Sequence, residues 1–262
     1  MTLVRNIIWF RRDLRIGDHP ALLEAIKNSD EIVPLFILDK TQIEEAGAKL
    51  LAYMGQSLRA LDESLGNKLH IIEGDQVEIL KELIARYNVK EVHISDEYER
   101  YGAARDARVE AAGIPLVRTG SPYAVKPGRV VKPSDGTPYR VYTPFYRAWR
   151  THGYRAPVAA PKEIKAPTPP AEYRKFPDFP FPEGVQIIEA GEVAALRRFK
   201  EFKKKGLANY DENRNLAAID GTSKMSTYLK FGEIHPRTLL HGLDESPAED
   251  TFRKEIAWRE FY

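Results

Sequence analysis

Strand-like and helix-like hydrophobic patterns alternate along the first 120 residues, and this alternation limits the fold more than any other feature. Five short apolar runs predict strands at residues 6–10, 32–38, 69–72, 92–95 and 116–118. Helical spacing fills the gaps between them, after Asp18 and Pro20, over residues 50–65, after Asp75 and over residues 105–112. Such alternation forms right-handed βαβ units, so we expect an α/β fold with a five-stranded parallel, Rossmann-like sheet.

Parallel sheets of this kind bind ligands at the carboxyl ends of their strands. Residues 1–120 contain neither the G-x-G-x-x-G nor the G-x-x-x-x-G-K-[ST] pattern. An ordinary dinucleotide or P-loop site is therefore not expected. An α/β nucleotide-binding module with a disordered tail is an alternative that predicts adenine-nucleotide binding and no affinity for DNA. The missing glycine motif argues against it.

Proline dominates the middle of the chain, where 13 of the 18 prolines lie between Pro122 and Pro182. Because proline removes a backbone donor, we expect no regular sheet or long helix there. Residues 121–188 are interpreted as a long, partly ordered connection between two domains. The connection is also basic and aromatic, with nine Lys/Arg against two acidic residues between Ser121 and Lys165. It is either a surface for a polyanion with exposed bases or a solvated loop whose rings pack inward.

Helical patterns resume near Glu189, so residues 189–262 are expected to begin an all-helical domain. One helix places Val193, Leu196 and Phe199 on a single face and ends near Gly206. A capping box at residues 246–249 starts the last helix. Cysteine is absent, so no disulfide or cysteine metal site can form, and we expect a cytoplasmic protein. No apolar run is long enough to span a bilayer, and no other metal site is expected.

Three segments carry chemistry-bearing side chains. The first, from Trp9 to Arg15, is a strand end with several guanidinium groups and one carboxylate, which indicates a structural salt-bridge cluster. The second, residues 221–226, clusters hydroxyl and N–H groups before a helix, which indicates either a phosphate site or an empty N-cap. In the third, residues 252–262, Glu255 and Arg259 have the spacing of an ion pair, and Trp258 alone would be assigned to the core.

In this order and spacing, the segments closely resemble the photolyase/cryptochrome family, and most of all the class I cyclobutane pyrimidine dimer photolyases. The resemblance implies that the helical domain binds FAD. The residues that match FAD contacts of the family are Tyr210, Thr222, Ser223, Lys224, Met225, Ser226, Phe252 and Arg259. Lys224 and Met225 depart from the family pattern, in which Arg and Leu occupy these positions. Lysine keeps the charge but loses the planar fork of arginine.

The same resemblance implies a DNA substrate that contains pyrimidine dimers. Glu255 matches a carboxylate at the base of the substrate pocket, and Trp258 matches a tryptophan that packs against the flipped-out dimer. These two residues are the implied catalytic pair of a deoxyribodipyrimidine photo-lyase, a carbon–carbon lyase. A damaged base pair is cheap to extrude, and an aromatic wall replaces lost stacking. Further DNA contacts are expected from Arg214 and Tyr262.

Several points stay open. Family members often carry a second, antenna chromophore (folate, deazaflavin or flavin) beside the α/β domain. Tyr101 and Gly102 stand where folate-type proteins have Asn and Glu, which argues against a folate and leaves a deazaflavin, a flavin or no antenna open. A cryptochrome-type photoreceptor is the main alternative, against which Trp258 and Glu255 argue, while repair of the (6-4) lesion depends on residues outside this chain. The resemblance covers about half of the family's usual length. We therefore expect a monomer whose flavin pocket lacks its later helices and which does not hold FAD firmly or repair DNA alone.

Overall fold

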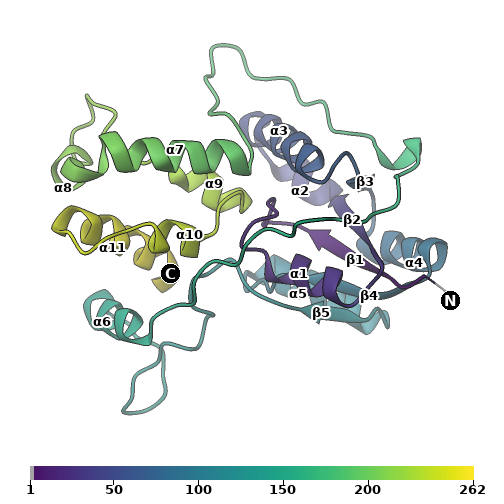
Figure 1. Ribbon diagram of the computed structural model, residues 1–262, viewed down its shortest axis with the longest axis horizontal. Helices are drawn as coiled ribbons and strands as arrows, with labels where there is room; N and C mark the ends of the chain where they lie inside the picture. The colour runs from purple at the N-terminus through teal and green to yellow at the C-terminus, as the bar shows by residue number, and fades with distance from the viewer. Residues whose placement is uncertain (1–2) are drawn as a thin grey trace.

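The computed structural model describes residues 3–262, and its first half is the expected α/β unit (Figure 1). Its strands are parallel in the order β3-β2-β1-β4-β5. They span Arg5–Phe10 (β1), Glu31–Leu38 (β2), His70–Glu73 (β3), Val89–Ile94 (β4) and Leu116–Arg118 (β5). The helices are Pro20–Lys27 (α1), Lys40–Glu45 (α2), Ala48–Ser64 (α3), Gln76–Tyr87 (α4) and Arg100–Ala111 (α5). The predicted five-stranded parallel sheet is thus confirmed.

Both faces of the sheet are buried. On one face, Ile7 and Val92 belong to a cluster with residues of α4 and α5. On the other, Ile8 and Phe10 belong to a cluster with residues of α1 and α3. Successive side chains of β1 therefore enter opposite cores, as the alternation of a strand requires. This is why the strands of a parallel sheet read as continuous apolar runs.

The proline-rich stretch differs from expectation because it contains an 11-residue helix, Tyr142–His152 (α6). Pro144 lies in the first turn of α6, where its missing N–H removes no intrahelical bond. Phe145 and Trp149 pack inward, so α6 supports the interpretation of a basic loop with inward-facing rings. The remaining segment runs across the α/β unit before it reaches the helical half (Figure 1). It is held there by backbone contacts such as Ile32 N–H to Lys165 O, 2.9 Å.

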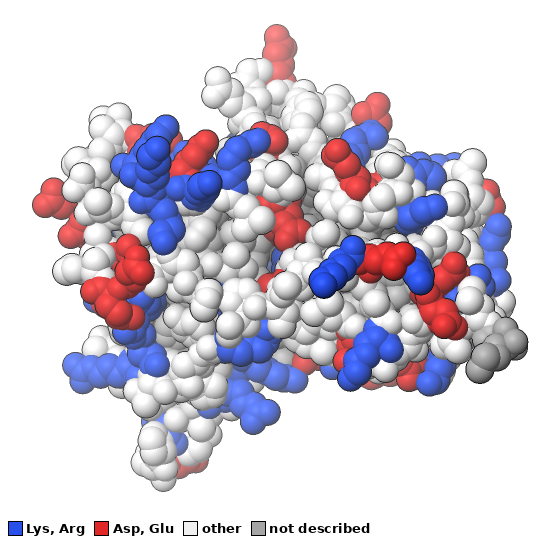
Figure 2. Space-filling view, viewed as in Figure 1, with Lys and Arg blue, Asp and Glu red and all other residues white. Residues whose placement is uncertain are grey.

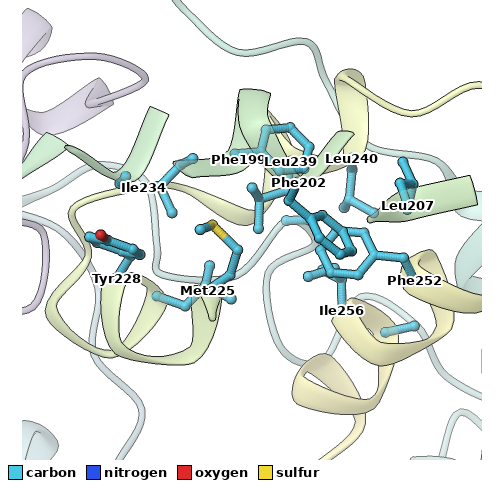
Figure 3. Packing of buried hydrophobic residues seen from close by; sticks show 14 of the residues in the cluster. Phe199, Phe202, Leu207, Met225, Tyr228, Ile234, Leu239, Leu240, Phe252 and Ile256 are labelled. Carbon is cyan, nitrogen blue, oxygen red and sulfur yellow. The ribbon is translucent and has the colours of Figure 1, made fainter. Parts of the chain in front are cut away.

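The second half is helical, as expected. It contains Glu192–Lys205 (α7), Tyr210–Asn213 (α8), Met225–Phe231 (α9), Pro236–His241 (α10) and Pro247–Phe261 (α11), with a short 3₁₀ turn at Leu207–Asn209. Another 3₁₀ turn, Ala171–Tyr173, belongs to the connection and contacts β3. Figure 3 shows the core of the helical half, in which rings of α7 and α11 meet. The predicted face of α7 is wrong, because Val193 and Leu196 are 70% and 42% exposed. The buried residues of α7 are Ala194, Ala195, Phe199 and Phe202.

The cap of α11 follows the predicted pattern in part. Ser246 Oγ accepts from Glu249 N–H at 3.2 Å, and Pro247 occupies the first helical position. Glu249 does not return a bond to Ser246, since its carboxylate accepts from the backbone N–H of Asp244. No helix within residues 3–262 is long and apolar enough to cross a membrane.

Candidate functional site

The arginine-rich end of β1 is a structural cluster, as its composition indicates. Asp13 accepts from Ser95 Oγ at 2.6 Å and from the backbone N–H of Arg11 at 2.8 Å, and it lies 3.1 Å from His19 Nε2. Burial alone would raise the pKa of Asp13, but His19 and Arg11 outweigh it and lower that pKa. Arg11 in turn pairs with Asp106 at 2.9 Å. The cluster therefore fixes the loop that follows β1.

This loop joins the α/β unit to the helical half. Leu14 N–H donates to Phe231 O at 3.1 Å, and Arg15 Nη1 donates to Gly232 O at 2.9 Å. Gly232 has φ +68°, and a Cβ at this position would lie 1.9 Å from Arg12 O. Only glycine meets both conditions. The end of α9 is thereby seated directly on the end of β1.

Buried carboxylates strengthen the same junction. Glu233 is fully buried and accepts from Tyr53 Oη (2.6 Å), Ser57 Oγ (2.7 Å) and Gly191 N–H (2.6 Å). Burial raises the pKa of Glu233. Asp18, also buried, pairs with Arg237 at 3.0 Å and with Arg155 at 3.1 Å. Two carboxylates thus tie residues far apart in sequence to one another.

A cavity of about 590 Å³ opens at the carboxyl ends of β1 and β2. This is the expected ligand position in a parallel sheet, and the volume is typical of small-molecule sites. Arg11 contributes a buried Nε that has no hydrogen-bond partner among residues 3–262. Other lining residues are mainly apolar around a few polar groups, and include Trp9, Phe36, Ile43, Leu50, Met54, Asp39, Gln42, Gln76 and Tyr101.

Gly102 also lines this cavity. A Cβ at Gly102 would lie 2.2 Å from Glu97 Oε2, so the position is closed to larger residues while Glu97 keeps its place. Glu97 itself pairs with Arg105 at 3.2 Å. The departure from the folate-type pattern at Tyr101 and Gly102 therefore falls on the wall of the cavity.

The predicted phosphate-binding segment, residues 221–226, comprises the end of the loop after α8 and the first two residues of α9. Thr222, Lys224 and Ser226 are exposed, whereas Ser223 and Met225 are buried. Gly221 is needed for a close approach, because a Cβ there would lie 2.3 Å from Asn213 O. Lys224 is the N-cap residue of α9, with φ +60° and no side-chain capping bond, whereas Ser223 Oγ accepts from Met225 N–H at 3.3 Å. The exposed hydroxyls of Thr222 and Ser226 can face a ligand.

Sequence reasoning missed Arg198, which holds this loop from α7. Its guanidinium donates to Ser223 O at 3.2 Å and to Thr222 O at 3.1 Å. It also lies 3.5 Å from Asp220, which pairs with Lys224 at 3.1 Å. Figure 2 shows that Lys and Arg gather over α7 and around α6 on this face of the molecule. The position of Arg198 within the lysine-rich helix gave no sign of this contact.

Tyr210 and Phe252, two expected FAD contacts, meet in the helical core. Their ring centroids are 5.4 Å apart in an edge-on arrangement, and both side chains are buried. Phe202 packs against each of them. Burial raises the pKa of the Tyr210 phenol. The two rings therefore pack α8 against α11.

Glu255 pairs with Arg214 at 2.5 Å, and both side chains are about one-third exposed. The Arg214 guanidinium also lies 5.5 Å from the centre of the Tyr210 ring. The expected ion pair between Glu255 and Arg259 is wrong. Arg259 turns away, donates to Pro122 O at 2.9 Å and covers the Tyr123 ring. The structure thus brings together Tyr210, Arg214, Phe252 and Glu255, and separates Arg259 from them.

Trp258 is half-buried and stacks on Tyr142 of α6, with ring centroids 3.6 Å apart and planes 8° from parallel. Tyr262 stacks less closely on Trp258, at 5.5 Å, and is itself 92% exposed. Tyr142 was assigned no role from the sequence, because α6 was not predicted. Glu260, next on α11, accepts from Ala124 N–H and Val125 N–H at 2.7 and 2.9 Å.

Comparisons with known proteins agree with this architecture. The DNA photolyase family profile matches residues 6–167. A deoxyribodipyrimidine photo-lyase of Synechococcus sp. is 32% identical over 98% of this chain and 59% of its own length. A class III photolyase from Agrobacterium tumefaciens has a TM-score of 0.86 at 31% identity, covering 100% of this chain and 58% of the other. A Sulfolobus tokodaii photolyase solved with two FAD molecules has a TM-score of 0.77 at 22% identity, covering 98% and 58%, which shows the fold alone.

The chain spans about 59% of the length of the Synechococcus relative. The class I resemblance stays a prediction, since the Agrobacterium neighbour is a class III protein. The family match itself covers most of the chain, from β1 to the segment that follows α6. It includes the arginine-rich strand end that seats the two halves on each other. This chain belongs to the DNA photolyase family.

Proposed function

We propose that this chain serves light-driven repair of cyclobutane pyrimidine dimers in DNA, acting as a monomer. The observation that carries the proposal is the grouping of Arg214, Glu255 and Trp258 on α8 and α11, each partly exposed. The Synechococcus relative, named for this activity, supports it. A cryptochrome-type photoreceptor is the second candidate and predicts flavin binding without repair.

The three side chains have distinct tasks. Trp258 offers an aromatic surface for a flipped-out base, and Tyr142 holds its indole in place by stacking behind it. Glu255 reads the polar edge of the pyrimidine. Arg214 holds this carboxylate in place by a hydrogen bond, which also raises the pKa of Arg214. When DNA arrives, Arg214 can turn to a phosphate and free Glu255 for the base.

FAD is the proposed cofactor and supplies, when bound, the light-excited electron. The loop at residues 221–226 fits a diphosphate, because Thr222, Lys224 and Ser226 present two hydroxyls and an ammonium outward. Ser223 and Met225 are buried and set the loop. Lys224, whose ammonium lies 3.1 Å from the Asp220 carboxylate, would exchange this anion for the diphosphate. The buried rings of Tyr210 and Phe252 and the half-buried Arg259 complete the set expected from the family.

We also propose that the 590 Å³ cavity holds the antenna chromophore. Apolar walls suit a flat ring system, and Gln42, Gln76 and Tyr101 supply polar groups at the cavity wall. Tyr101 and Gly102 on its wall favour a deazaflavin or a flavin over a folate. On this view residues 1–120 form the antenna domain, residues 121–188 the connection and residues 189–262 the beginning of the FAD domain.

The test is an absorbance spectrum of the purified chain, and of any longer product of its gene, followed by blue-light repair of a dimer-containing oligonucleotide. Glu255→Gln and Trp258→Leu should lower repair while flavin content is unchanged. Lys81→Gln, an exposed change on α4 away from the proposed sites, is the matched control. Flavin binding without repair would favour the photoreceptor. If both variants repair DNA as well as the unchanged protein, Glu255 and Trp258 do not contact the substrate.

A further inference from the structure

Five oxidisable rings form one continuous row between α11 and the end of α6. Trp258 stacks on Tyr142 at 3.6 Å between ring centroids, and Tyr142 stacks on Tyr146 at 5.8 Å. Tyr146 lies 6.2 Å from Trp149, which lies 5.3 Å from Tyr154. The 3.6 Å pair is in direct face-to-face contact, and the other separations are within the usual range of about 4.5–7 Å for aromatic pairs. The row therefore has no gap from one end to the other.

Only tyrosine and tryptophan occur in this row, and that composition is informative. These are the side chains of this cysteine-free protein whose rings lose one electron most readily. Phe261 touches Tyr142 and Trp258 from the side, but no link depends on it. A purely hydrophobic packing requirement would accept phenylalanine at every position. The tyrosines and tryptophans of the row can therefore transfer an electron, which packing alone does not require.

Proton acceptors stand beside the inner rings. Tyr146 Oη donates to the Asp250 carboxylate, and Trp149 Nε1 donates to Glu260 Oε2 at 3.4 Å. An oxidised phenol or indole loses its proton easily to such a group. Tyr142 Oη donates instead to a backbone carbonyl, Lys254 O, which cannot take a proton. Tyr142 is therefore a bridge, and Tyr146 and Trp149 are the places where a radical can rest.

The two ends reach different surroundings. Trp258 is half-buried on α11 beside Glu255, whereas Trp149 in the middle is fully buried. Tyr154 lines an open cleft of about 760 Å³ on the other side of α6. Small solutes can reach Tyr154 there without entering the region around Trp258. The row thus connects the proposed DNA pocket to a separate, solvent-accessible cleft.

We propose that this row is an electron relay that protects the DNA pocket from oxidation. An aromatic one-electron oxidant beside Trp258, such as a nucleobase radical cation, takes one electron from the indole and is restored. One electron then moves from Tyr154 through Trp149, Tyr146 and Tyr142 to Trp258. Tyr154, having given this electron to the row, releases its phenolic proton to water and is left as a neutral radical. A soluble thiol returns one electron and one proton to Tyr154, so one thiyl radical forms for each oxidant removed.

The biological use of the relay rests on the proposed function, but its test does not, because the oxidant is supplied chemically. The chain has no cysteine, so Tyr262→Cys gives one attachment point for a ruthenium polypyridyl photosensitiser next to Trp258. Flash oxidation with persulfate as electron acceptor starts the reaction. A phenol-coupling trap in solution marks the final radical, and mass spectrometry of the peptides locates it.

We expect the trap to add mainly at Tyr154. Tyr142→Phe and Tyr146→Phe keep the rings but raise the barrier, and each should lower the Tyr154 adduct at least about tenfold, since about 1.4 kcal/mol of barrier is tenfold in rate. Tyr139→Phe, whose ring meets Phe145 outside the row, should leave the adduct unchanged. Adducts that stay at Trp258, or Tyr154 adducts that are equal in all three variants, would overturn the relay.

Discussion

Replacing Gly232 with alanine should reveal how tightly the two halves are seated on each other. Gly232 has φ +68°, and an added Cβ would lie 1.9 Å from the carbonyl oxygen of Arg12. A left-handed backbone costs a non-glycine residue about 1–2 kcal/mol. Overpacking against a backbone atom, which cannot swing aside, adds about 1–3 kcal/mol. We therefore expect the free energy of unfolding to fall by about 2–5 kcal/mol.

Gly136 provides a matched control. Its φ is +67°, but an added Cβ would meet nothing within 4 Å. Gly136→Ala should therefore lower the free energy of unfolding by about 1–2 kcal/mol, the backbone cost alone. Gly232→Asn should recover part of that backbone cost, because asparagine tolerates left-handed φ, but not the overpacking. The three substitutions together separate conformational strain from steric contact.

Urea unfolding followed by tryptophan fluorescence measures the difference, because Trp9 reports the sheet and Trp149 the helical half. For a chain of this size each kcal/mol corresponds to roughly 2–4 °C in Tm. Gly232→Ala should thus melt several degrees below Gly136→Ala. Equal stability of the two variants within about 0.5 kcal/mol would refute the reasoning, since that is the usual spread for neutral surface changes.

Three further perturbations probe charge. Asp18→Ala leaves the buried Arg237 without its counter-charge and should lower the free energy of unfolding by about 3–5 kcal/mol in urea titrations. Arg155→Ala removes the more exposed partner of Asp18 and should lower it by less than about 1 kcal/mol. Burial lowers the pKa of His70 from 6.5 to about 4, because the folded state disfavours the charged imidazolium. As pH falls from 6.5 to 4, the free energy of unfolding should therefore decrease by about 3 kcal/mol. His70→Gln should show a flatter pH profile of unfolding. A double-mutant cycle of Arg214→Ala and Glu255→Ala should give a coupling of only about 0.5–1 kcal/mol, because both groups are partly exposed.

Local sequence patterns predicted those features that neighbouring residues decide. The strands were found because each is a short apolar run, and α4 begins where Asp75 accepts from Val77 N–H and Glu78 N–H. The start of α1 agrees with the predicted position of Pro20, but Asp18 does not cap the helix. Its N-cap is His19, whose Nδ1 accepts from Leu22 N–H at 3.1 Å, while Asp18 is turned into the junction. A residue recruited by a distant arginine cannot also cap its own helix.

The helix α6 shows a second reason for failure. Its sequence carries a proline and many basic residues, and propensity alone places it in a loop. It forms because Phe145 and Trp149, four residues apart, can both enter the core of the second half. That core is assembled from α7 to α11, far along the chain. The stabilising partner was therefore absent from any local window.

In the candidate site, the ion pair predicted from spacing along one helix was wrong because a tertiary contact replaces it. Spacing on one helix favoured a Glu255–Arg259 pair, yet α8 packs on α11 and delivers Arg214 to Glu255 at 2.5 Å. Arg259, released from that pair, can donate to Pro122 O and cover Tyr123 on the connection. An exposed pair on one helix contributes only a few tenths of a kcal/mol. A tertiary contact that also orders two loops easily outweighs it, so the partners of the candidate residues could not be predicted from spacing along one helix.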